Sequence, residues 1–377
     1  ISEISIVPGA KNQYDLPIAK SKFQPDRELI LELQLVQKTA HPALPINHEL
    51  AWDQFVLQPH VELNYNQKAA ADFKVSVENG VYHIQNSNTE LLLDSLTGAI
   101  QSWQYMGQTI TSENIVPHFW RPPTDNDLGN GMPTWAKQWQ TATYDNRPTL
   151  VELPSISKGH VTFSVEFKLP ENEAIVTHKI TLHNSGELKL DYRFNPLKKE
   201  LPLLPRLGLN LQLPGEFNTV NWYGKGPHET YWDRKTGAKI GYYTGPVTAQ
   251  FHRYSRPQET GNKTDVRFFE VHSDALILRI TGNDRLFNAS VWPFRTKMLD
   301  FSNEEAGASA SGLVPVTKKH GADIQIEDGV QLNLDHLQMG VGGDTSWGRM
   351  VHEEYTIKPK PYNFIFVIHP QQKTLSD

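Results

Sequence analysis

Strict alternation of apolar and polar residues is the feature of this sequence that most constrains its fold. Between residues 161 and 169, Val, Phe, Val, Phe and Leu alternate with Thr, Ser, Glu and Lys, and similar runs cover residues 29–36 and 188–194. Side chains along a strand point to opposite faces in turn, so this period of two predicts strands with one buried and one solvated face. A helical pattern is clearest at residues 134–142, behind Pro133.

Short turn sequences separate the alternating runs. Asn-Gly occupies residues 79–80, Asn-Ser-Gly residues 184–186 and Asp-Gly residues 328–329, each between two apolar-polar segments. Asn-Gly and Asp-Gly tolerate the positive φ that tight hairpins require. Hairpins at this spacing predict an all-β fold of antiparallel sheets.

Composition excludes several classes of function. The chain of 377 residues has no cysteine, which rules out disulfides, thiolate catalysis and Cys-ligated zinc. A net charge of −6 gives no electrostatic reason to bind nucleic acid or an anionic membrane. The first residues, Ile-Ser-Glu-Ile, lack both an initiator Met and a signal-peptide pattern, so we expect a fragment or a processed product. A cytoplasmic location is the default expectation.

A domain boundary is predicted near residues 60–72. The strand pattern ends around Leu57, and residues 67–71 form a polar, small-residue connection. The residues before it suffice for only three or four strands, which is short for a complete sandwich. We therefore predict domains at residues 1–62 and 73–372, a linker at 63–72 and a tail at 373–377.

The first segment that could carry chemistry spans residues 119–131. Its sequence, Phe-Trp-Arg-Pro-Pro-Thr-Asp-Asn-Asp-Leu-Gly-Asn-Gly, combines stiff prolines, turn-forming Asx residues and free glycines. Arg121, Asp125, Asn126 and Asp127 could bind a polyol or a cation. The residues alone favour the alternative, a self-hydrogen-bonded loop with an internal Arg–Asp pair.

The second segment, residues 223–234, reads Tyr-Gly-Lys-Gly-Pro-His-Glu-Thr-Tyr-Trp-Asp-Arg. It lacks the Gly-Lys-Ser/Thr that a phosphate-binding loop requires. His228 and Glu229 could form an acid/base pair. Adjacent residues of an extended chain point to opposite faces, which weakens that interpretation.

The third segment, residues 256–262, is unusually polar for a connection and precedes Asp265 and Arg267. Arg256, Glu259 and Asn262 either line a pocket or tie two sheets together through charge-assisted hydrogen bonds. Both interpretations remain open on the residues alone.

The fourth segment, residues 339–348, reads Met-Gly-Val-Gly-Gly-Asp-Thr-Ser-Trp-Gly. Its glycines allow the backbone to approach another group closely. A core Trp normally lies within a strand, whereas Trp347 ends an irregular glycine-rich loop. Trp347 is therefore a candidate ligand platform.

Together and in this order, the four segments resemble the C-terminal region of the large β-galactosidases of glycoside hydrolase family two. The match extends over essentially the whole chain. The resemblance implies that residues 73–372 form a large antiparallel super-sandwich related to galactose mutarotases. It also implies that residues 1–62 are the second half of an immunoglobulin-like β-sandwich, so that the chain begins inside a domain.

The resemblance implies retaining hydrolysis of terminal β-galactosides such as lactose. That reaction needs two carboxylates about 5–5.5 Å apart, which in the family lie on an upstream barrel domain. We expect no catalytic residue on this chain, and we assign no role to its two Asn-Glu pairs, at residues 172–173 and 303–304. By resemblance, Trp347 forms an aromatic platform for substrate in the active site.

Other expectations also follow from the resemblance. The stretch of Gly129, Asn130, Gly131 and Met132 resembles a loop that closes near the active site. No metal or cofactor is expected on this chain, whereas the complete enzyme would hold Mg²⁺ and Na⁺. The expected partners are the barrel-bearing portion of the enzyme, a β-galactoside and further copies in a homo-oligomer, with no nucleic acid or membrane.

Two alternatives remain open. The first is a stand-alone aldose 1-epimerase, which needs a histidine and a carboxylate in one pocket. The motifs offer four candidates for it: His118, His228, Glu229 and Glu259. The second alternative is a carbohydrate-binding or assembly module without catalysis.

Overall fold

The computed structural model describes residues 6–19, 23–61, 71–300, 306–308, 315–317, 319–344 and 348–373; for residues 172, 306–308 and 315–317 it describes the backbone alone. The chain divides into two compact units, Ile1–Leu63 and Asn64–Asp377. This division falls at the start of the stretch predicted as a linker. Each unit is described by itself.

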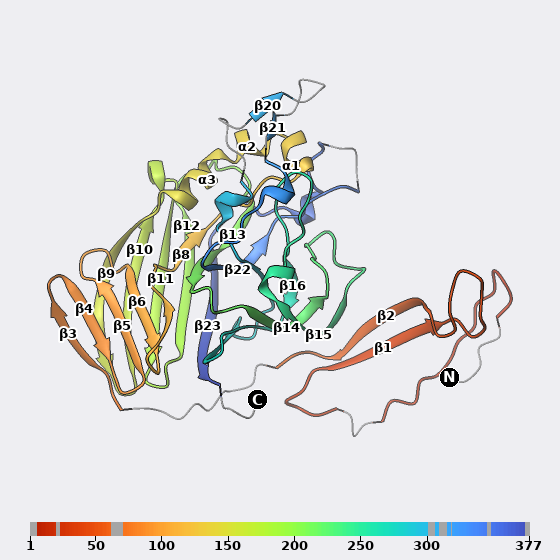
Figure 1. Ribbon diagram of the computed structural model, residues 1–377, viewed down its shortest axis with the longest axis horizontal. Helices are drawn as coiled ribbons and strands as arrows, with labels where there is room; N and C mark the ends of the chain where they lie inside the picture. The colour runs from red at the N-terminus through yellow and green to blue at the C-terminus, as the bar shows by residue number, and fades with distance from the viewer. Residues whose placement is uncertain are drawn as a thin grey trace. The chain divides into compact units, whose positions relative to one another are not determined.

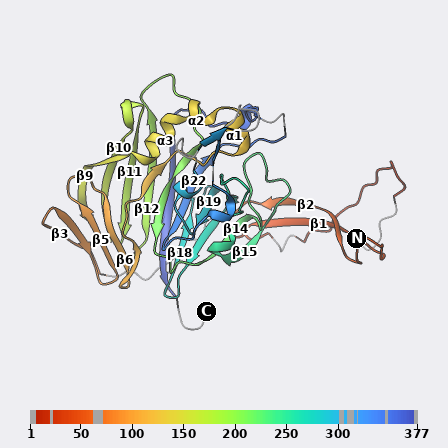
Figure 2. The same ribbon diagram turned by 45° about the horizontal axis from the view of Figure 1, so that its top comes forward.

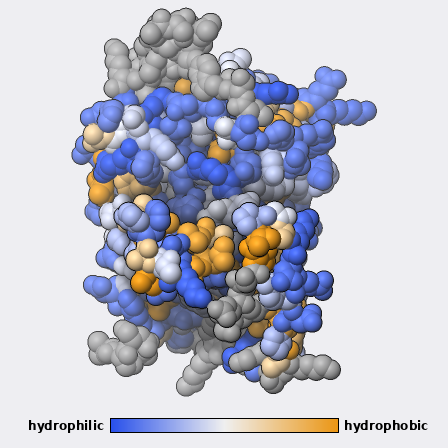
Figure 3. All heavy atoms as spheres, turned by 90° about the vertical axis from the view of Figure 1, so that its right-hand side faces the viewer, coloured by the Kyte–Doolittle hydropathy of each residue, from blue (hydrophilic) through white to orange (hydrophobic). Residues whose placement is uncertain are grey.

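The first unit contains one antiparallel ribbon of β1 (Leu29–Val36) and β2 (Glu49–Gln58). The strands lie where the alternation predicts, but the predicted buried face is wrong: Leu33 and Leu35 of β1 are 40% and 54% exposed. Phe55 and Val56, which point to opposite faces of β2, are also exposed. Exposed apolar side chains appear in orange in Figure 3. A two-stranded ribbon has no second layer of its own to cover either face.

The second unit is built on a nine-stranded antiparallel sheet in the order β15-β14-β17-β18-β23-β12-β11-β10-β9 (Figure 1). The alternating runs at 161–169 and 188–194 form β10 and β12, whose apolar residues are buried as predicted. The strands are β9 (Arg147–Ser157), β10 (His160–Lys168), β11 (Ala174–His183), β12 (Leu188–Pro196), β14 (Thr219–Gly226), β15 (Lys239–Pro246), β17 (Phe268–His272), β18 (Leu276–Thr281) and β23 (Tyr362–Gln372).

Two five-stranded sheets pack against it. In the first, β3 to β7 follow in sequence order beside β9–β11 (Figures 1 and 2). The second has the order β16-β19-β22-β13-β8, and His336 of β22 stacks on Phe364 of β23 at 4.8 Å. Their strands are β3 (Lys74–Glu78), β4 (Val81–Gln85), β5 (Thr89–Asp94), β6 (Ile100–Tyr105), β7 (Gln108–Thr111), β8 (Val116–His118), β13 (Arg206–Leu213), β16 (Lys263–Val266), β19 (Phe287–Trp292) and β22 (Val330–Gln338).

The remaining elements are short. A two-stranded hairpin pairs β20 (Ala306–Ala308) with β21 (Pro315–Thr317). The helices are α1 (Asp125–Gly129), α2 (Met132–Trp135) and α3 (Lys137–Tyr144), and the 3-10 turns are η2 (Pro170–Asn172), η3 (Val247–Ala249), η4 (Thr296–Met298), η6 (Gly321–Asp323) and η7 (Glu353–Tyr355). None of the helices in the described ranges is long and apolar enough to cross a membrane. The all-β prediction with large antiparallel sheets is confirmed.

Two of the three predicted hairpins are present. Asn79 and Gly80 adopt φ of 50° and 80° between β3 and β4, and Gly186 adopts φ of 96° between β11 and β12. The hairpin predicted at residues 328–329 is wrong, because residues 324–327, directly before the turn, form no strand. Ile324 instead packs in a small apolar cluster with Trp292, while β22 pairs with β13 and β19.

The helix predicted at residues 134–142 is interrupted. Ala136, with φ −103° and ψ 9°, separates α2 from α3. Each flanking tryptophan finds its own partner: the Trp135 indole N–H donates to Asn130 Oδ1 at 3.1 Å, and the Trp139 N–H donates to the Pro202 carbonyl at 3.2 Å. The two hydrogen-bond acceptors, Asn130 and Pro202, lie on different segments of the chain, and this favours two short helices over one continuous helix.

Candidate functional site

The glycine-rich fourth segment is held by side chains of the first and second segments. The Asp233 carboxylate accepts hydrogen bonds from the backbone N–H groups of Val341, at 3.0 Å, and Gly342, at 2.7 Å. Asn126 Nδ2 donates to the Val341 carbonyl at 3.1 Å. We call this group of contacts, together with those that Arg121 makes to the same loop, the loop clamp. It fixes both the donors and the acceptors of the loop backbone.

Arg121 completes the loop clamp from the interior. Its guanidinium donates to the carbonyls of Met339 and Gly340, at 2.8 Å for Gly340. It also forms a two-bond pair with Asp127, at 2.8 and 3.2 Å, in which both side chains are buried. Burial alone lowers the pKa of Arg121, but the neighbouring Asp127 carboxylate raises it overall. Arg121 therefore stays charged, and its internal pair and its loop contacts coexist.

Two glycines of the fourth segment, one within the loop clamp and one beyond it, approach other segments too closely for a side chain. A Cβ on Gly340 would lie 2.5 Å from Asp233 Oδ2, closer than any real contact. A Cβ on Gly348 would lie 3.0 Å from the Gly129 carbonyl oxygen, and Gly348 has a φ of 78°. The fourth segment thus meets the second segment before the predicted platform and the first segment after it. Trp347 itself lies outside the described residues.

The third segment is tied to the first. Arg256 Nε donates to Asp125 Oδ1 at 2.8 Å, and Gln258 Nε2 donates to Asp125 Oδ2 at 3.2 Å. The backbone N–H of Glu259 donates to the Pro122 carbonyl at 3.1 Å. These bonds join the loop at 119–131 to the loop at 256–262, in keeping with the interpretation that the third segment ties parts of the fold together.

A buried charge cluster lies beneath these loops, in the sheet of β8, β13 and β22. Arg206 Nη2 contacts both Glu259 oxygens at 3.2 and 3.3 Å, and Arg206 Nε lies 3.2 Å from Asp335 Oδ2. His118 Nδ1 lies 3.3 Å from Arg206 Nη1. All four side chains are buried. In the register of the sheet, Gly208 pairs with both His118 and Asp335, so the cluster spans adjacent strands.

Burial sets the protonation of this cluster. It raises the pKa of Asp335 to about 7, with Arg206 opposing and Glu259 reinforcing the rise. It also raises the pKa of Glu259, against the influence of Arg206. Burial and the Arg206 charge hold the pKa of His118 well below its usual value, so His118 is neutral at neutral pH. The four buried side chains of this cluster are therefore suited to stabilising the fold, and none of them is exposed to a substrate.

The Glu229 carboxylate accepts hydrogen bonds from four donors. These are Thr260 Oγ1 at 3.0 Å, the Gly261 N–H at 2.8 Å, and the side chains of Arg234 and Tyr254. Burial alone raises the pKa of Glu229, but these hydrogen bonds lower it overall, which makes Glu229 a weak base.

The residues of the epimerase alternative fall into two environments. His228 and Glu229 both line an open depression of about 550 Å³, which His118 and Glu259 do not line. His118 and Glu259 instead meet Arg206 in the interior.

Asn262 joins the second and third segments. Its Nδ2 donates to the Thr230 carbonyl at 2.8 Å, and the Thr230 N–H donates to the Asn262 carbonyl at 2.7 Å. Asn262 is fully buried.

The predicted closing loop is a tight connection between α1 and α2. Asn130 Oδ1 accepts from the Met132 N–H at 3.1 Å, Gly131 has a φ of 78°, and Met132 is fully buried. Gly129 is the last residue of α1 and lies beneath Gly348.

Comparison with known families identifies the chain. Residues 85–368 match the family model described as beta galactosidase small chain, and residues 1–58 match the one described as beta-galactosidase, domain 4. The chain belongs to the β-galactosidase small-chain family. The resemblance carried by the four motifs is confirmed.

Curated relatives of this small-chain member include β-galactosidases from several bacteria. That of Priestia megaterium is 29% identical over 377 residues, which cover 98% of this chain and 34% of the relative. Those of Psychromonas ingrahamii and Lactobacillus delbrueckii subsp. bulgaricus are each 30% identical, covering 74% and 73% of this chain. The chain spans about a third of the length of the curated relatives it matches.

Solved structures of two epimerases also align with this small-chain member. A putative aldose 1-epimerase from Escherichia coli aligns with a TM-score of 0.43 and 9% identity, covering 80% of this chain and 99% of its own. A galactose 1-epimerase from Lactobacillus acidophilus aligns with a TM-score of 0.40 and 8% identity, covering 81% of this chain and 100% of its own. Similarity this low does not bear on function.

The described ranges contain no metal-binding cluster. No group of three or more His, Asp or Glu side chains there is placed to hold a metal ion. Of the two Asn-Glu pairs, Glu173 is buried, with burial raising its pKa, and residues 303–304 lie outside the described residues.

Sequence reasoning missed Arg206, Asp233 and Asp335 as organising residues. Asp233 has no predicted role within the second segment, although its carboxylate holds the fourth. Arg206 and Asp335 lie in alternating strands, where polar positions are expected to face water. A usable signal was present in β22, where Gln331, Asn333 and Asp335 occupy alternate positions, and all three are buried.

Proposed function

We propose that this chain is the non-catalytic C-terminal part, or the small subunit, of a β-galactosidase that hydrolyses terminal β-galactosides such as lactose. Its family membership and its coverage of about a third of the curated relatives support this assignment. In this proposal the acid/base and nucleophile carboxylates lie on a barrel-bearing portion outside this chain, as do the ligands of the Mg²⁺ and Na⁺ ions. The complete enzyme is a homo-oligomer.

The loop clamp is the observation that carries the proposed role. Arg121, Asn126 and Asp233 together hold the backbone of residues 339–342 by hydrogen bonds from two other segments. Because polar side chains and glycines hold this loop in one position, they also set where the following residues of the fourth segment begin. Trp347 lies at the far end of the fourth segment, next to its last residue.

In this proposal, Trp347 is the part of the chain that meets the substrate. An indole ring stacks on the C–H face of a pyranose and excludes water from one side of it. Such a platform orients the sugar and the group attached to it without transferring a proton. Its contribution to catalysis comes from positioning.

Reconstitution tests the assignment. The 377-residue chain would be mixed with a separately produced barrel-bearing portion of a β-galactosidase of this family, and hydrolysis of o-nitrophenyl β-galactoside would be followed. Neither part should hydrolyse the substrate alone, and the mixture should. Hydrolysis by the chain alone, or no activity from a soluble complex of the two parts, would contradict the proposal.

A further inference from the structure

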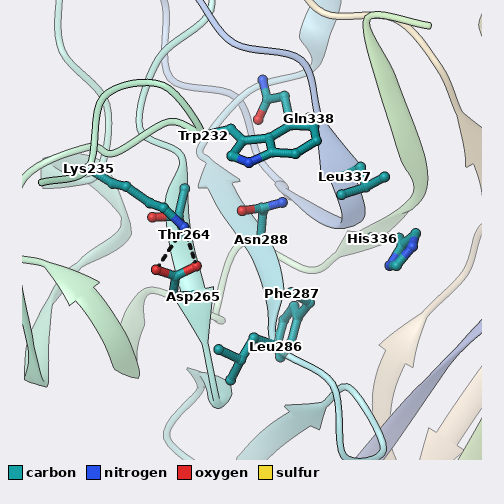
Figure 4. Close-up of a pocket in the computed structure, with 10 residues that line it drawn as sticks. All are labelled: Trp232, Lys235, Thr264, Asp265, Leu286, Phe287, Asn288, His336, Leu337 and Gln338. Carbon is teal, nitrogen blue, oxygen red and sulfur yellow. Dashed lines mark hydrogen bonds and ion pairs between the residues drawn. The ribbon is translucent and has the colours of Figure 1, made fainter. Parts of the chain in front are cut away.

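A cavity of about 120 Å³ lies where β16, β19 and β22 approach the second segment (Figure 4). One water needs on the order of 10–15 Å³ by the same measure, so the cavity holds several waters or one small molecule. Its lining comprises Trp232, Lys235, Thr264, Asp265, Leu286, Phe287, Asn288, His336, Leu337 and Gln338.

Among the half-buried polar groups of the lining, the carboxamide of Asn288 and the indole N–H of Trp232 form no hydrogen bond with the part of the chain that the structure describes. Figure 4 shows the Asn288 carboxamide beneath the Trp232 ring, within the cavity. Half-buried amides and indole N–H groups normally form hydrogen bonds, so these two are available to whatever fills the space.

An ion pair forms one side of the cavity. Lys235 Nζ contacts Asp265 Oδ1 at 2.7 Å and Oδ2 at 3.0 Å, and both side chains remain about a third exposed or less. Asp265 has a φ of 51°, a conformation that costs energy for a residue with a side chain. That backbone conformation lies directly beside the cavity.

The rest of the lining is apolar or neutral. Leu286, Phe287 and Leu337 also line the cavity; in Figure 4, Leu286 and Phe287 lie below the ion pair and Leu337 lies on the opposite side. Burial lowers the pKa of His336 to about 4, with the Arg285 charge adding to the effect, so this ring is neutral at neutral pH. The only full charges in the lining are Lys235 and Asp265, which compensate each other.

We propose that this cavity binds a neutral pyranose sugar. A pyranose has an apolar C–H face, which the Trp232 ring can cover, and hydroxyls that both donate and accept. Asn288 offers both a donor and an acceptor, and the Lys235–Asp265 pair offers one of each sign. A charged ligand would leave one member of that pair opposed to it. The inference does not rest on the proposed function, because the lining belongs wholly to this chain.

Calorimetric titration of the full chain with galactose tests the proposal. We expect saturable binding with a millimolar Kd, weakened about tenfold or more in Asn288→Ala because two hydrogen bonds are lost. Asn195→Ala is the matched control, since Asn195 is an exposed amide on β12 outside the cavity. Its Kd should equal that of the unmodified chain.

A second variant and two other ligands test the proposal further. Trp232→Phe, which keeps a ring but removes the N–H, should weaken galactose binding and leave the chain folded by circular dichroism. Glycerol and galacturonate should each bind more weakly than galactose. Absence of saturable galactose binding, an unchanged Kd in both variants, or tighter binding of galacturonate would overturn the proposal. A chain that fails here yet restores hydrolysis in the reconstituted enzyme would leave the proposed function intact.

Discussion

Arg206 lies with its guanidinium buried between two carboxylates and a histidine, on a strand that pairs with strands on both sides. The strand Arg206–Leu213 alternates leucines with polar residues and glycine, a pattern that does not predict the burial of Arg206. Polar residues of a half-buried strand normally face water, and only the second layer of a fold decides otherwise. The burial of Arg206 with two carboxylates and a histidine could therefore not be predicted from the alternation of the sequence.

Removing the Arg206 charge should destabilise the chain strongly. Arg206→Met would leave Glu259 and Asp335 buried without their cation, which costs about 3–5 kcal/mol. Equilibrium urea denaturation followed by circular dichroism measures this loss. Arg147→Met, which removes an exposed pair with Asp145, is the control and should cost less than about 1 kcal/mol. Equal stability of the two variants would contradict the burial of the cluster.

The pH dependence of stability should report on Asp335. Its folded pKa is raised to about 7 from 3.8, so the folded chain holds a proton that the unfolded chain releases between about pH 4 and 7. The stabilisation is present below pH 4 and is lost as the pH rises to 7.

Asp335→Asn removes this proton and should flatten the profile. The unmodified chain should lose up to about 1.4 kcal/mol per pH unit more than the variant across this window. Urea denaturation at half-unit pH steps measures the difference. Parallel profiles for the two proteins would show that Asp335 does not titrate there.

At the scale of elements, a turn sequence predicted a hairpin correctly where strands were present on both sides of the turn. Asn79-Gly80 formed its hairpin because positive φ and two flanking strands coincide. The Asp-Gly at 328–329 failed because Ile324 found partners in a separate apolar cluster. The convergence of the four segments was beyond any local signal, since hydrogen bonds such as Asp233 to Val341 join residues 108 positions apart.

Glycine at position 340 should matter through the loop clamp. Gly340→Ala places a methyl group 2.5 Å from Asp233 Oδ2, so the loop backbone or Asp233 must move. In the reconstituted enzyme we expect kcat/KM for o-nitrophenyl β-galactoside to fall about tenfold or more. Gly237→Ala is the control, because nothing lies within 4 Å of its added Cβ. Equal activities would argue against the loop clamp as a positioning device.

At the scale of the whole molecule, the two units differ in how well they bury their apolar residues. The second unit shares one apolar core across its three large sheets. The ribbon of β1 and β2 exposes Leu33, Leu35 and Phe55. The shortage of strands before residue 60 was readable from the sequence, whereas the exposure of both ribbon faces was not, because alternation specifies a pattern and not its partner.

The backbone amides of the β1–β2 ribbon should exchange hydrogen more slowly when the rest of the enzyme is supplied. Two-stranded ribbons are marginally stable in water, so amides of residues 29–36 and 49–58 should exchange quickly in the chain alone. Hydrogen exchange followed by mass spectrometry should show slower exchange there after mixing with the barrel-bearing portion. Residues 188–196, in a central strand, provide the internal reference and should be protected in both states. Equal protection of the ribbon before and after mixing would mean that no further layer covers it.

The most direct test of the central claim is the kinetic effect of Trp347→Ala in the reconstituted β-galactosidase. We predict that complex formation is unchanged while kcat/KM for o-nitrophenyl β-galactoside falls at least tenfold, about 1.4 kcal/mol of transition-state stabilisation. Trp347→Phe should recover part of the loss, and Leu96→Ala, at a side chain that is 80% exposed, should change nothing. A complex that assembles normally and hydrolyses the substrate equally well with Trp347→Ala would contradict the claim that this chain shapes the active site through Trp347.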